Sequence, residues 1–231
     1  MGFMKFASIS FIFLIFQSCI TLGTLDSGPP QPAGNLDPLR TKVLQAAQDL
    51  QGNRPEAQVT VKGKSFTLDC IGTVSAAYWG AGVDIRKDFG RYEGNGVSRL
   101  YQSLDNRRIL ARHTKPQEGD LIFWENTWDR NNDGIVGNDG PTHAGLVMKV
   151  DQDGTIHYLH EDYLKGVVVA VMNLNRPGVY KDELGKTLNT PLYLGSYPGN
   201  PKNPPKFLSG DLWVGFGGVS EVAKILGISG L

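Results

Sequence analysis

One cysteine and a small set of histidines are the residues of this chain best suited to covalent chemistry. The sequence holds only two cysteines, and Cys19 stands close to the N-terminus, which leaves Cys70 without a partner. A lone thiol is either a buried, inert side chain or a nucleophile whose reactive form is the thiolate. Three of the four histidines, His143, His157 and His160, fall within one short downstream segment. The chain therefore contains a candidate nucleophile and candidate bases for it.

The residues around Cys70 predict that it opens a helix. Asp69 stands at the N-cap position, and Cys70, Val74, Ala77 and Tyr78 share one face of the expected helix. Because a helix N-terminus stabilises negative charge, we expect the pKa of the Cys70 thiol to be lowered. The Cys70 amide could also contribute to an oxyanion hole. Asp69 has two interpretations, a cap without chemistry or a residue that helps to place a substrate amine.

The general base is expected to come from a strand. His143 opens an apolar run over 144–148, and a polar group on the neighbouring strand could fix its tautomer. His157 and His160 both lie on that neighbouring run. Since residues three apart point to opposite faces of a strand, only one of them can face His143. We prefer His160, and interpret His157 as a solvated strand position.

Apolar periodicity predicts the elements that must position these residues. Residues 39–50 form an amphipathic helix, and further helical character lies around 97–104. Short apolar runs predict strands at 121–124, 144–150, 155–159 and 167–171, with a strand or extended loop at 59–66. Short connections between the later strands indicate an antiparallel meander, and helices followed by strands are the pattern of an α+β domain. A last apolar segment, 207–226, is expected to pack on that domain.

Length and charge bound the class of protein. A chain of 231 residues with 40% hydrophobic residues can bury one substantial core. Lys and Arg balance Asp and Glu at 23 each, so the net charge gives no reason to expect nucleic acid or an anionic membrane surface as a partner. The domain plan is a signal peptide over 1–19, a flexible Pro- and Gly-rich linker over 20–38, a catalytic domain over 39–190 and a C-terminal extension over 191–231.

The N-terminal residues resemble an export signal. Lys5 precedes an apolar run over 6–16 that is too short for a permanent transmembrane helix. The run ends in Phe-Gln-Ser-Cys at 16–19, which resembles the lipobox of bacterial lipoproteins, although Gln17 stands where a small residue is usual. We expect Cys19 to be lipidated, with a plain cleaved signal or an uncleaved anchor as the alternatives.

The segment 129–139 resembles a calcium-binding loop. Its Asp-x-Asn-x-Asp-Gly spacing places oxygen ligands at positions one, three and five. The candidate ligands are Asp129, Asn131, Asp133, the carbonyl of Ile135, and Asp139. Position twelve is Gly140 instead of a bidentate glutamate, so Asp139 would have to substitute for it. Clusters of Asp, Asn and Gly also form ordinary turns, and a structural calcium ion and a plain turn both stay open.

Four segments carry short motifs in a fixed order. They are Phe-Thr-Leu-Asp-Cys-Ile-Gly at 66–72, Gly-Asp-Leu-Ile-Phe at 119–123, Thr-His-Ala-Gly-Leu at 142–146 and Tyr-Leu-His at 158–160. They resemble the Asp-Cys-Ser-Gly, Gly-Asp-Leu, His-Val-Gly and Ile-His motifs of the NlpC/P60 family of bacterial cell-wall cysteine peptidases. Together the matching segments fall between Leu39 and Val171. The main departure is Ile71, which stands where a serine is common.

The resemblance implies a papain-like fold, with N-terminal helices packed on an antiparallel meander. It also implies a cysteine endopeptidase that hydrolyses amide bonds in peptidoglycan stem peptides. Cys70 would be the nucleophile, His143 the base and then the acid, and His160 the residue that orients His143, with Asp69 beside the substrate. The alternatives are an N-acetylmuramoyl-L-alanine amidase on the same scaffold, a catalytically silent wall-binding lipoprotein, or a calcium-stabilised module in which Cys70 is only buried.

The resemblance also implies the expected partners and location. The partner is the peptidoglycan stem peptide, and nucleic acid is not expected. No cofactor is required, and a structural calcium ion in the 129–139 loop stays open. We expect a monomer in the bacterial cell envelope, facing the periplasm or the cell surface. It would contact the membrane only through a lipid or an N-terminal anchor.

Overall fold

The structure, a computed structural model, describes residues 1–2, 37–112, 115–195 and 199–227. The chain divides into two units, Met1–Asn35 and Leu36–Leu231, and the fold described below is that of the second. Nearly all of the predicted signal peptide and linker, including the lipobox-like end at Cys19, lie outside the described residues. Within the described ranges, no helix is both long enough and apolar enough to cross a membrane.

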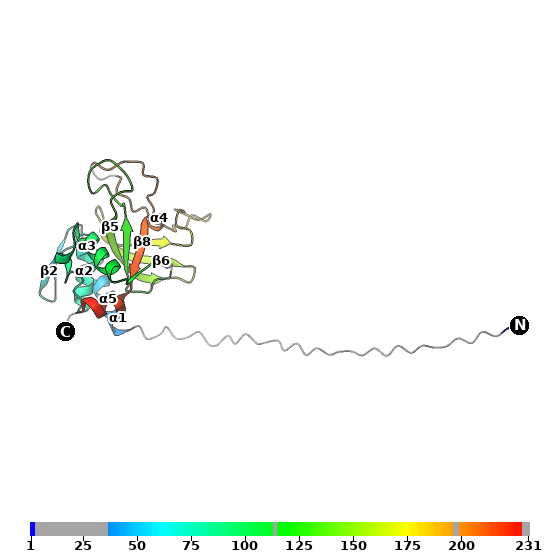
Figure 1. The fold of residues 1–231 in the computed structure, drawn as a ribbon, viewed down its shortest axis with the longest axis horizontal. Helices are drawn as coiled ribbons and strands as arrows, with labels where there is room; N and C mark the ends of the chain where they lie inside the picture. Colours follow the sequence, from blue (N-terminus) through cyan, green and yellow to red (C-terminus); the bar gives the residue numbers. More distant parts are fainter. Residues whose placement is uncertain (3–36, 113–114, 196–198, 228–231) are drawn as a thin grey trace. The chain divides into compact units, whose positions relative to one another are not determined.

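A six-stranded antiparallel sheet forms the centre of the fold (Figure 1). Its strands are β3 (Leu110–Ala111), β4 (Leu121–Glu125), β5 (Pro141–Val150), β6 (Thr155–Asp162), β7 (Gly166–Asn173) and β8 (Trp213–Gly217), in the spatial order β3-β8-β4-β5-β6-β7. The consecutive strands β4 to β7 form the expected meander, which confirms the α+β class. A separate hairpin joins β1 (Gln58–Val61) to β2 (Lys64–Thr67).

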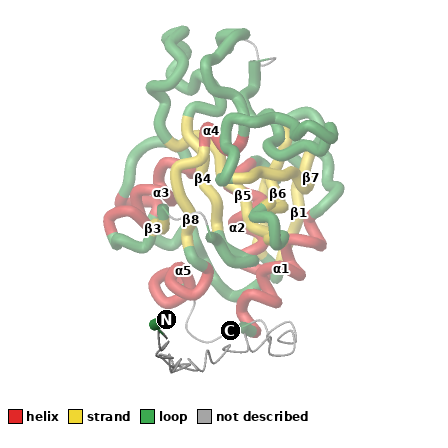
Figure 2. Tube along the Cα trace, turned by 90° about the vertical axis from the view of Figure 1, so that its right-hand side faces the viewer, coloured by secondary structure: helices red, strands yellow, loops and turns green. Residues whose placement is uncertain are grey.

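The longer helices gather on one face and one end of the sheet, and one four-residue helix lies apart from them, against β4 and β7 (Figure 2). The helices are α1 (Pro38–Leu50), α2 (Cys70–Gly80), α3 (Gly96–Asn106), α4 (Ser209–Leu212) and α5 (Val219–Leu226), with a 3-10 turn, η1, at Phe89–Arg91. α2 and α3 pack on β5, and α1 packs on both α2 and α5. The three helices predicted from the sequence, at 39–50, from Cys70 onward and around 97–104, are therefore confirmed.

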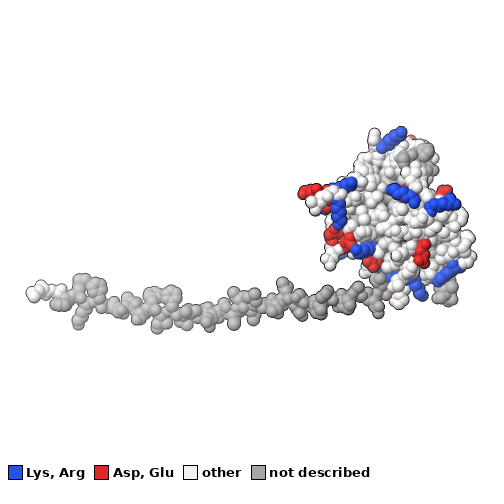
Figure 3. Space-filling model, turned by 180° about the vertical axis from the view of Figure 1, so that it is seen from behind, with Lys and Arg blue, Asp and Glu red and all other residues white. Residues whose placement is uncertain are grey.

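Charged side chains of both signs are interspersed over the surface. On the face seen in Figure 3, Lys and Arg side chains lie among Asp and Glu side chains without a large region of one sign. This arrangement agrees with the equal numbers of basic and acidic residues in the sequence.

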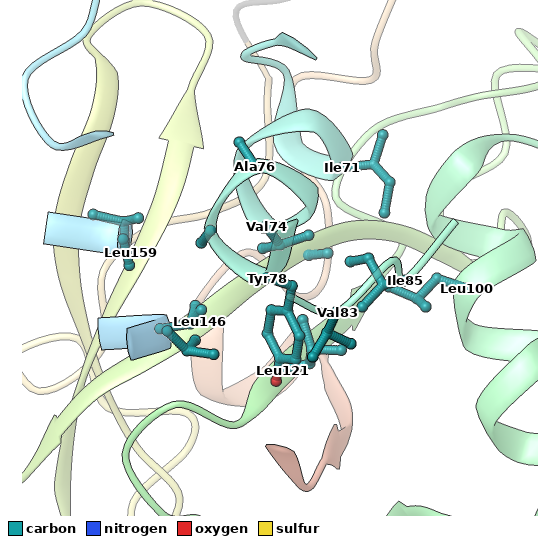
Figure 4. Close-up of a cluster of buried hydrophobic side chains, with 14 of the residues drawn as sticks. Ile71, Val74, Ala76, Tyr78, Val83, Ile85, Leu100, Leu121, Leu146 and Leu159 are labelled. Carbon is teal, nitrogen blue, oxygen red and sulfur yellow. The ribbon is translucent and has the colours of Figure 1, made fainter. Parts of the chain in front are cut away.

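The main hydrophobic core lies between α2 and the sheet. Figure 4 shows Val74 and Tyr78 of α2 near Leu121 of β4 and Leu146 of β5, all of them fully buried. The Tyr78 hydroxyl donates a 2.8 Å hydrogen bond to the carbonyl oxygen of Gly119, so its buried polar atom is satisfied. This packing fixes α2, and with it Cys70, against the middle of the meander.

The C-terminal extension contributes a strand to the interior of the sheet, which the sequence did not predict. β8 lies between β3 and β4, and Gly217 is paired with Leu121. A Cβ atom at Gly217 would lie 2.8 Å from a methyl carbon of Leu104, so this strand position has no room for a side chain. Glycine weakens the strand signal of a sequence, and Gly215, Gly217 and Gly218 therefore conceal β8.

Candidate active site

Cys70 is the first residue of α2, as the sequence predicts. The extended backbone of Asp69 ends the preceding segment, and its Oδ1 accepts a 2.6 Å hydrogen bond from the Gly72 amide. The Asp69 carbonyl accepts a second hydrogen bond, 2.9 Å long, from the Thr73 amide. Asp69 is therefore the helix cap, and one of its carboxylate oxygens takes part in that role.

The two residues after Cys70 fix the start of the helix against its neighbours. A Cβ atom at Gly72 would lie 1.7 Å from the carbonyl oxygen of Thr67, so only glycine lets α2 begin this close to the end of β2. Ile71, which replaces the serine common in the resembling family, packs on the backbone of Gly96 at the start of α3. Isoleucine at position 71 therefore adds an apolar contact between the start of α2 and the start of α3.

Cys70, His143 and His160 line one cavity of about 290 Å³. Asp69 and Glu161 lie in the same wall. The half-buried thiol contacts β5 directly, because the amides of Ile71 and Ala144 donate hydrogen bonds toward its sulfur. Among the described residues, no hydrogen bond joins the thiol to the His143 ring. Catalytic hydrogen bonds are often long in ligand-free proteins and shorten when substrate binds.

The histidines pair as the sequence suggests. Nε2 of His143 lies 3.0 Å from Nδ1 of His160, which leaves Nδ1 of His143 as the nitrogen for the thiol. His157 points elsewhere, and its Nε2 lies 2.7 Å from the Asp151 carboxylate. His160, and not His157, is therefore the third member of the cluster.

Aromatic rings support the two histidines from behind. The ring centroid of Trp124 lies 5.7 Å from that of His143 and 4.7 Å from that of Tyr158. The ring centroids of Tyr158 and His160 are 5.2 Å apart. The indole N–H of Trp124 donates a 2.8 Å hydrogen bond to the carbonyl of Ser209, in the C-terminal extension. These contacts restrict the orientation of both imidazoles, and the sequence did not predict them.

The charge state of the site differs from the sequence prediction. Burial, followed by the charges of Asp69 and Glu161, raises the pKa of the Cys70 thiol to about 12. The prediction that the helix start lowers this pKa is therefore wrong. The hydrogen bonds from the backbone amides do favour the thiolate, but burial and the two carboxylates outweigh them.

The imidazoles are shifted toward their neutral forms. Burial, and then the neighbouring His160, hold the pKa of His143 well below its usual value. Burial lowers the pKa of His160 to about 4. A neutral His160 can accept through Nδ1 the proton that the Nε2–H tautomer of His143 donates, which leaves Nδ1 of His143 unprotonated. At neutral pH the resting site thus holds a thiol and an imidazole, not an ion pair.

The calcium-loop candidates lie together in the connection between β4 and β5. Their oxygen atoms accept hydrogen bonds from the loop itself: Asp129 from the amides of Asp133 and Gly134, and Asp139 from the amides of Arg130 and Asn131. Within the described part of the chain, no three His, Cys, Asp or Glu side chains are gathered for a metal ion. Calcium binding through this loop, including the Ile135 carbonyl, stays a prediction.

Three parts of the cavity wall were not anticipated from the sequence. Residues 191–194 of the C-terminal extension line it, together with Trp128 from the loop after β4. Glu161 also lines it and is only 8% exposed. The only sequence signal for Glu161 was its place directly after His160, whereas 191–194 carried no signal at all.

No family model, curated protein or solved structure matches the chain.

Proposed function

We propose that this chain is a cysteine hydrolase of the NlpC/P60 type, acting on amide bonds in peptidoglycan stem peptides. The observation that carries the proposal is the placement of Cys70 and His143 on one cavity, with His160 3.0 Å from the far nitrogen of His143. A helix that presents the cysteine at its start, packed on an antiparallel sheet that presents the histidines, also supports a papain-like arrangement. The substrate class rests on the sequence motifs.

The resting charge state leads to a specific order of proton transfers. As the Cys70 sulfur attacks the carbonyl carbon, Nδ1 of His143 takes the thiol proton, and the carbonyl π electrons move to oxygen. The Cys70 amide, at the head of α2, would stabilise that oxyanion. Collapse of the intermediate breaks the C–N bond, and His143 returns the proton to the leaving amine. Water, deprotonated by His143, then hydrolyses the thioester to a carboxylic acid and the free thiol.

The resemblance of the N-terminal residues to an export signal supports a location of the proposed hydrolase in the bacterial cell envelope. Lipidation at Cys19 would hold it on a membrane, where peptidoglycan is within reach of a tethered domain. An N-acetylmuramoyl-L-alanine amidase would use the same chemistry as the proposed endopeptidase and would differ from it only in the amide bond that is cut.

The test is digestion of purified sacculi, followed by mass spectrometry of the released fragments. We expect the wild type to create new peptide termini, and Cys70→Ala and His143→Ala to create none. His157→Ala is the matched control, because His157 contacts Asp151 outside the cavity, and it should retain activity. A wild type that releases nothing would contradict the proposal, as would an active Cys70→Ala. The identity of the new termini separates an endopeptidase from an amidase.

A further inference from the structure

Four rings form a closed cluster that contains the histidine pair. The ring centroid of Trp124 lies 5.7 Å from that of His143 and 4.7 Å from that of Tyr158. The centroids of His143 and His160 are 5.2 Å apart, as are those of His160 and Tyr158. Trp124 and Tyr158 are fully buried. Because each ring contacts two others, rotation of either imidazole would displace a fully buried aromatic side chain.

The backbone around Trp124 departs from regular pairing on both sides. The register between β4 and β8 shifts between Phe123 and Trp124, and the register between β4 and β5 shifts between Trp124 and Glu125. Such irregularities redirect side chains, and they are common next to active sites. A Cβ atom at Gly145 would lie 3.0 Å from a ring carbon of Trp124, so this glycine leaves room for the indole beside His143.

The indole is anchored in the C-terminal extension. Nε1 of Trp124 donates a 2.8 Å hydrogen bond to the carbonyl oxygen of Ser209, which is fully buried. Ser209 is itself held by two hydrogen bonds: its amide donates to the Thr190 carbonyl at 3.0 Å, and its hydroxyl donates to the Val171 carbonyl at 3.1 Å. The acceptor for Trp124 is therefore fixed to β7, the strand next to the one that carries His160.

A second tryptophan in the same layer lacks such an anchor. Trp213 of β8 is paired with Trp124 across the two strands. Its buried indole N–H has no hydrogen-bond partner among the described residues, and its ring packs on Phe216, with centroids 5.0 Å apart. Of these two neighbours, only the tryptophan beside the histidines has its orientation set by a hydrogen bond.

We propose that Trp124 is a positioning residue for the His143–His160 pair, and that the C-terminal extension holds it through the Ser209 carbonyl. The inference rests on the proposed function and makes the extension part of the catalytic apparatus. Trp124 would keep Nε2 of His143 against Nδ1 of His160, which lie 3.0 Å apart, and so leave Nδ1 of His143 for the thiol proton. Since Trp124 is fully buried and lies outside the cavity wall formed by the described residues, it would act on the imidazoles and not on the substrate.

The kinetic test compares Trp124→Phe with Trp213→Phe on soluble muropeptides over a range of concentrations. We expect Trp124→Phe, which keeps a ring but loses the N–H, to lower kcat by roughly ten- to a hundredfold and to leave KM nearly unchanged. Trp213→Phe removes an N–H that makes no hydrogen bond in the described structure, and it should keep the wild-type kcat. Equal losses in the two variants, or a wild-type kcat in Trp124→Phe, would overturn the inference.

A second measurement needs no turnover, so a failed sacculus digestion would not be mistaken for failure of this inference. Nitrogen-15 NMR of labelled histidines reports the tautomer of His143 and the rate at which its Nε2 proton exchanges with water. We expect one tautomer and slow exchange in the wild type and in Trp213→Phe, and faster exchange with mixed tautomers in Trp124→Phe.

Circular dichroism shows whether the variants fold. If Trp124→Phe does not, Ser209→Ala takes its place: it loses the hydrogen bond to Val171 and should change the imidazole spectrum in the same direction, by less. A wild-type spectrum in folded Trp124→Phe would contradict the positioning role. In its absence, a wild-type spectrum in Ser209→Ala would do so.

Discussion

At the residue scale, the Glu161 carboxyl couples folding to pH. Its pKa of about 7 in the folded protein lies above the ordinary value of 4.5, with burial as the main cause. The folded state therefore binds more protons than the unfolded state between these two values, and stability falls as pH rises through that window. Below the ordinary value both states are protonated and the penalty is absent.

We expect Glu161→Gln to remove this penalty. The difference in free energy of unfolding between the variant and the wild type should be roughly 2 kcal/mol larger at pH 8 than at pH 4.5. This figure includes a discount for solvent access through the cavity. Urea unfolding of both proteins at the two pH values measures the difference. Glu183→Gln should show no such dependence, since its side chain is exposed. A gain that is the same at both pH values would contradict the assignment of the titration to Glu161.

Part of the candidate site was predictable from the sequence, but its charge states were not. Asp69, Cys70 and His143 were found because caps, helix starts and strand runs are local patterns. The raised pKa of Cys70 depends first on burial, then on Asp69, and then on Glu161, which is distant in sequence. Burial and the approach of Glu161 both arise from the packing of α2 against β5 and β6. A helix N-terminus alone would have lowered that pKa, so the local signal pointed in the wrong direction.

At the scale of the element, the start of α2 depends on the absence of a side chain at residue 72. The clash of a Cβ atom with the Thr67 carbonyl involves backbone, which cannot rotate away as a flexible side chain could. Relief would require α2 to move away from β2, and Cys70 would move with it.

Gly72→Ala should therefore lower the free energy of unfolding by at least about 2 kcal/mol. Gly90→Ala is the control, because a Cβ atom there meets nothing within 4 Å and the backbone is not left-handed. That substitution should be neutral or slightly stabilising, since it restricts the unfolded chain. Denaturant unfolding monitored by circular dichroism compares the two. A Gly72→Ala protein as stable as Gly90→Ala would show that α2 does not begin where the structure places it.

The elements themselves were predictable where the periodicity was strong. Helices α1, α2 and α3 and the strands of the meander were expected within a few residues of their observed positions, whereas α4 and α5 were expected only as part of an apolar segment. β8 was missed because its glycines remove the alternating apolar pattern, and because its neighbours β3 and β4 lie about a hundred residues earlier in the chain. Pairing over such a distance leaves no local trace.

At the scale of the whole molecule, Asp120 joins three distant parts of the chain. One carboxylate oxygen accepts from the Arg40 guanidinium of α1, at 2.9 Å, and from the Val219 amide at the start of α5, at 3.1 Å. The other accepts from the Gln117 amide, at 2.8 Å. Both members of the Arg40–Asp120 ion pair are buried. Asp120 belongs to the Gly-Asp-Leu motif found in the sequence, but its hydrogen bonds to α1 and α5 could not be predicted from that motif.

Asp120→Ala should cost about 3–5 kcal/mol in free energy of unfolding, because it leaves the buried Arg40 guanidinium without its counter-ion and the Val219 amide without its acceptor. Asp105→Ala is the matched control: it removes the carboxylate of an exposed ion pair with Arg112, also about 3.0 Å long, and should cost less than about 1 kcal/mol. Denaturant midpoints give both values. Amide hydrogen exchange then localises the effect, which should loosen α1 and α5 together, since a shared acceptor holds them. Equal costs for the two variants would mean that the termini of the domain are held by apolar packing alone.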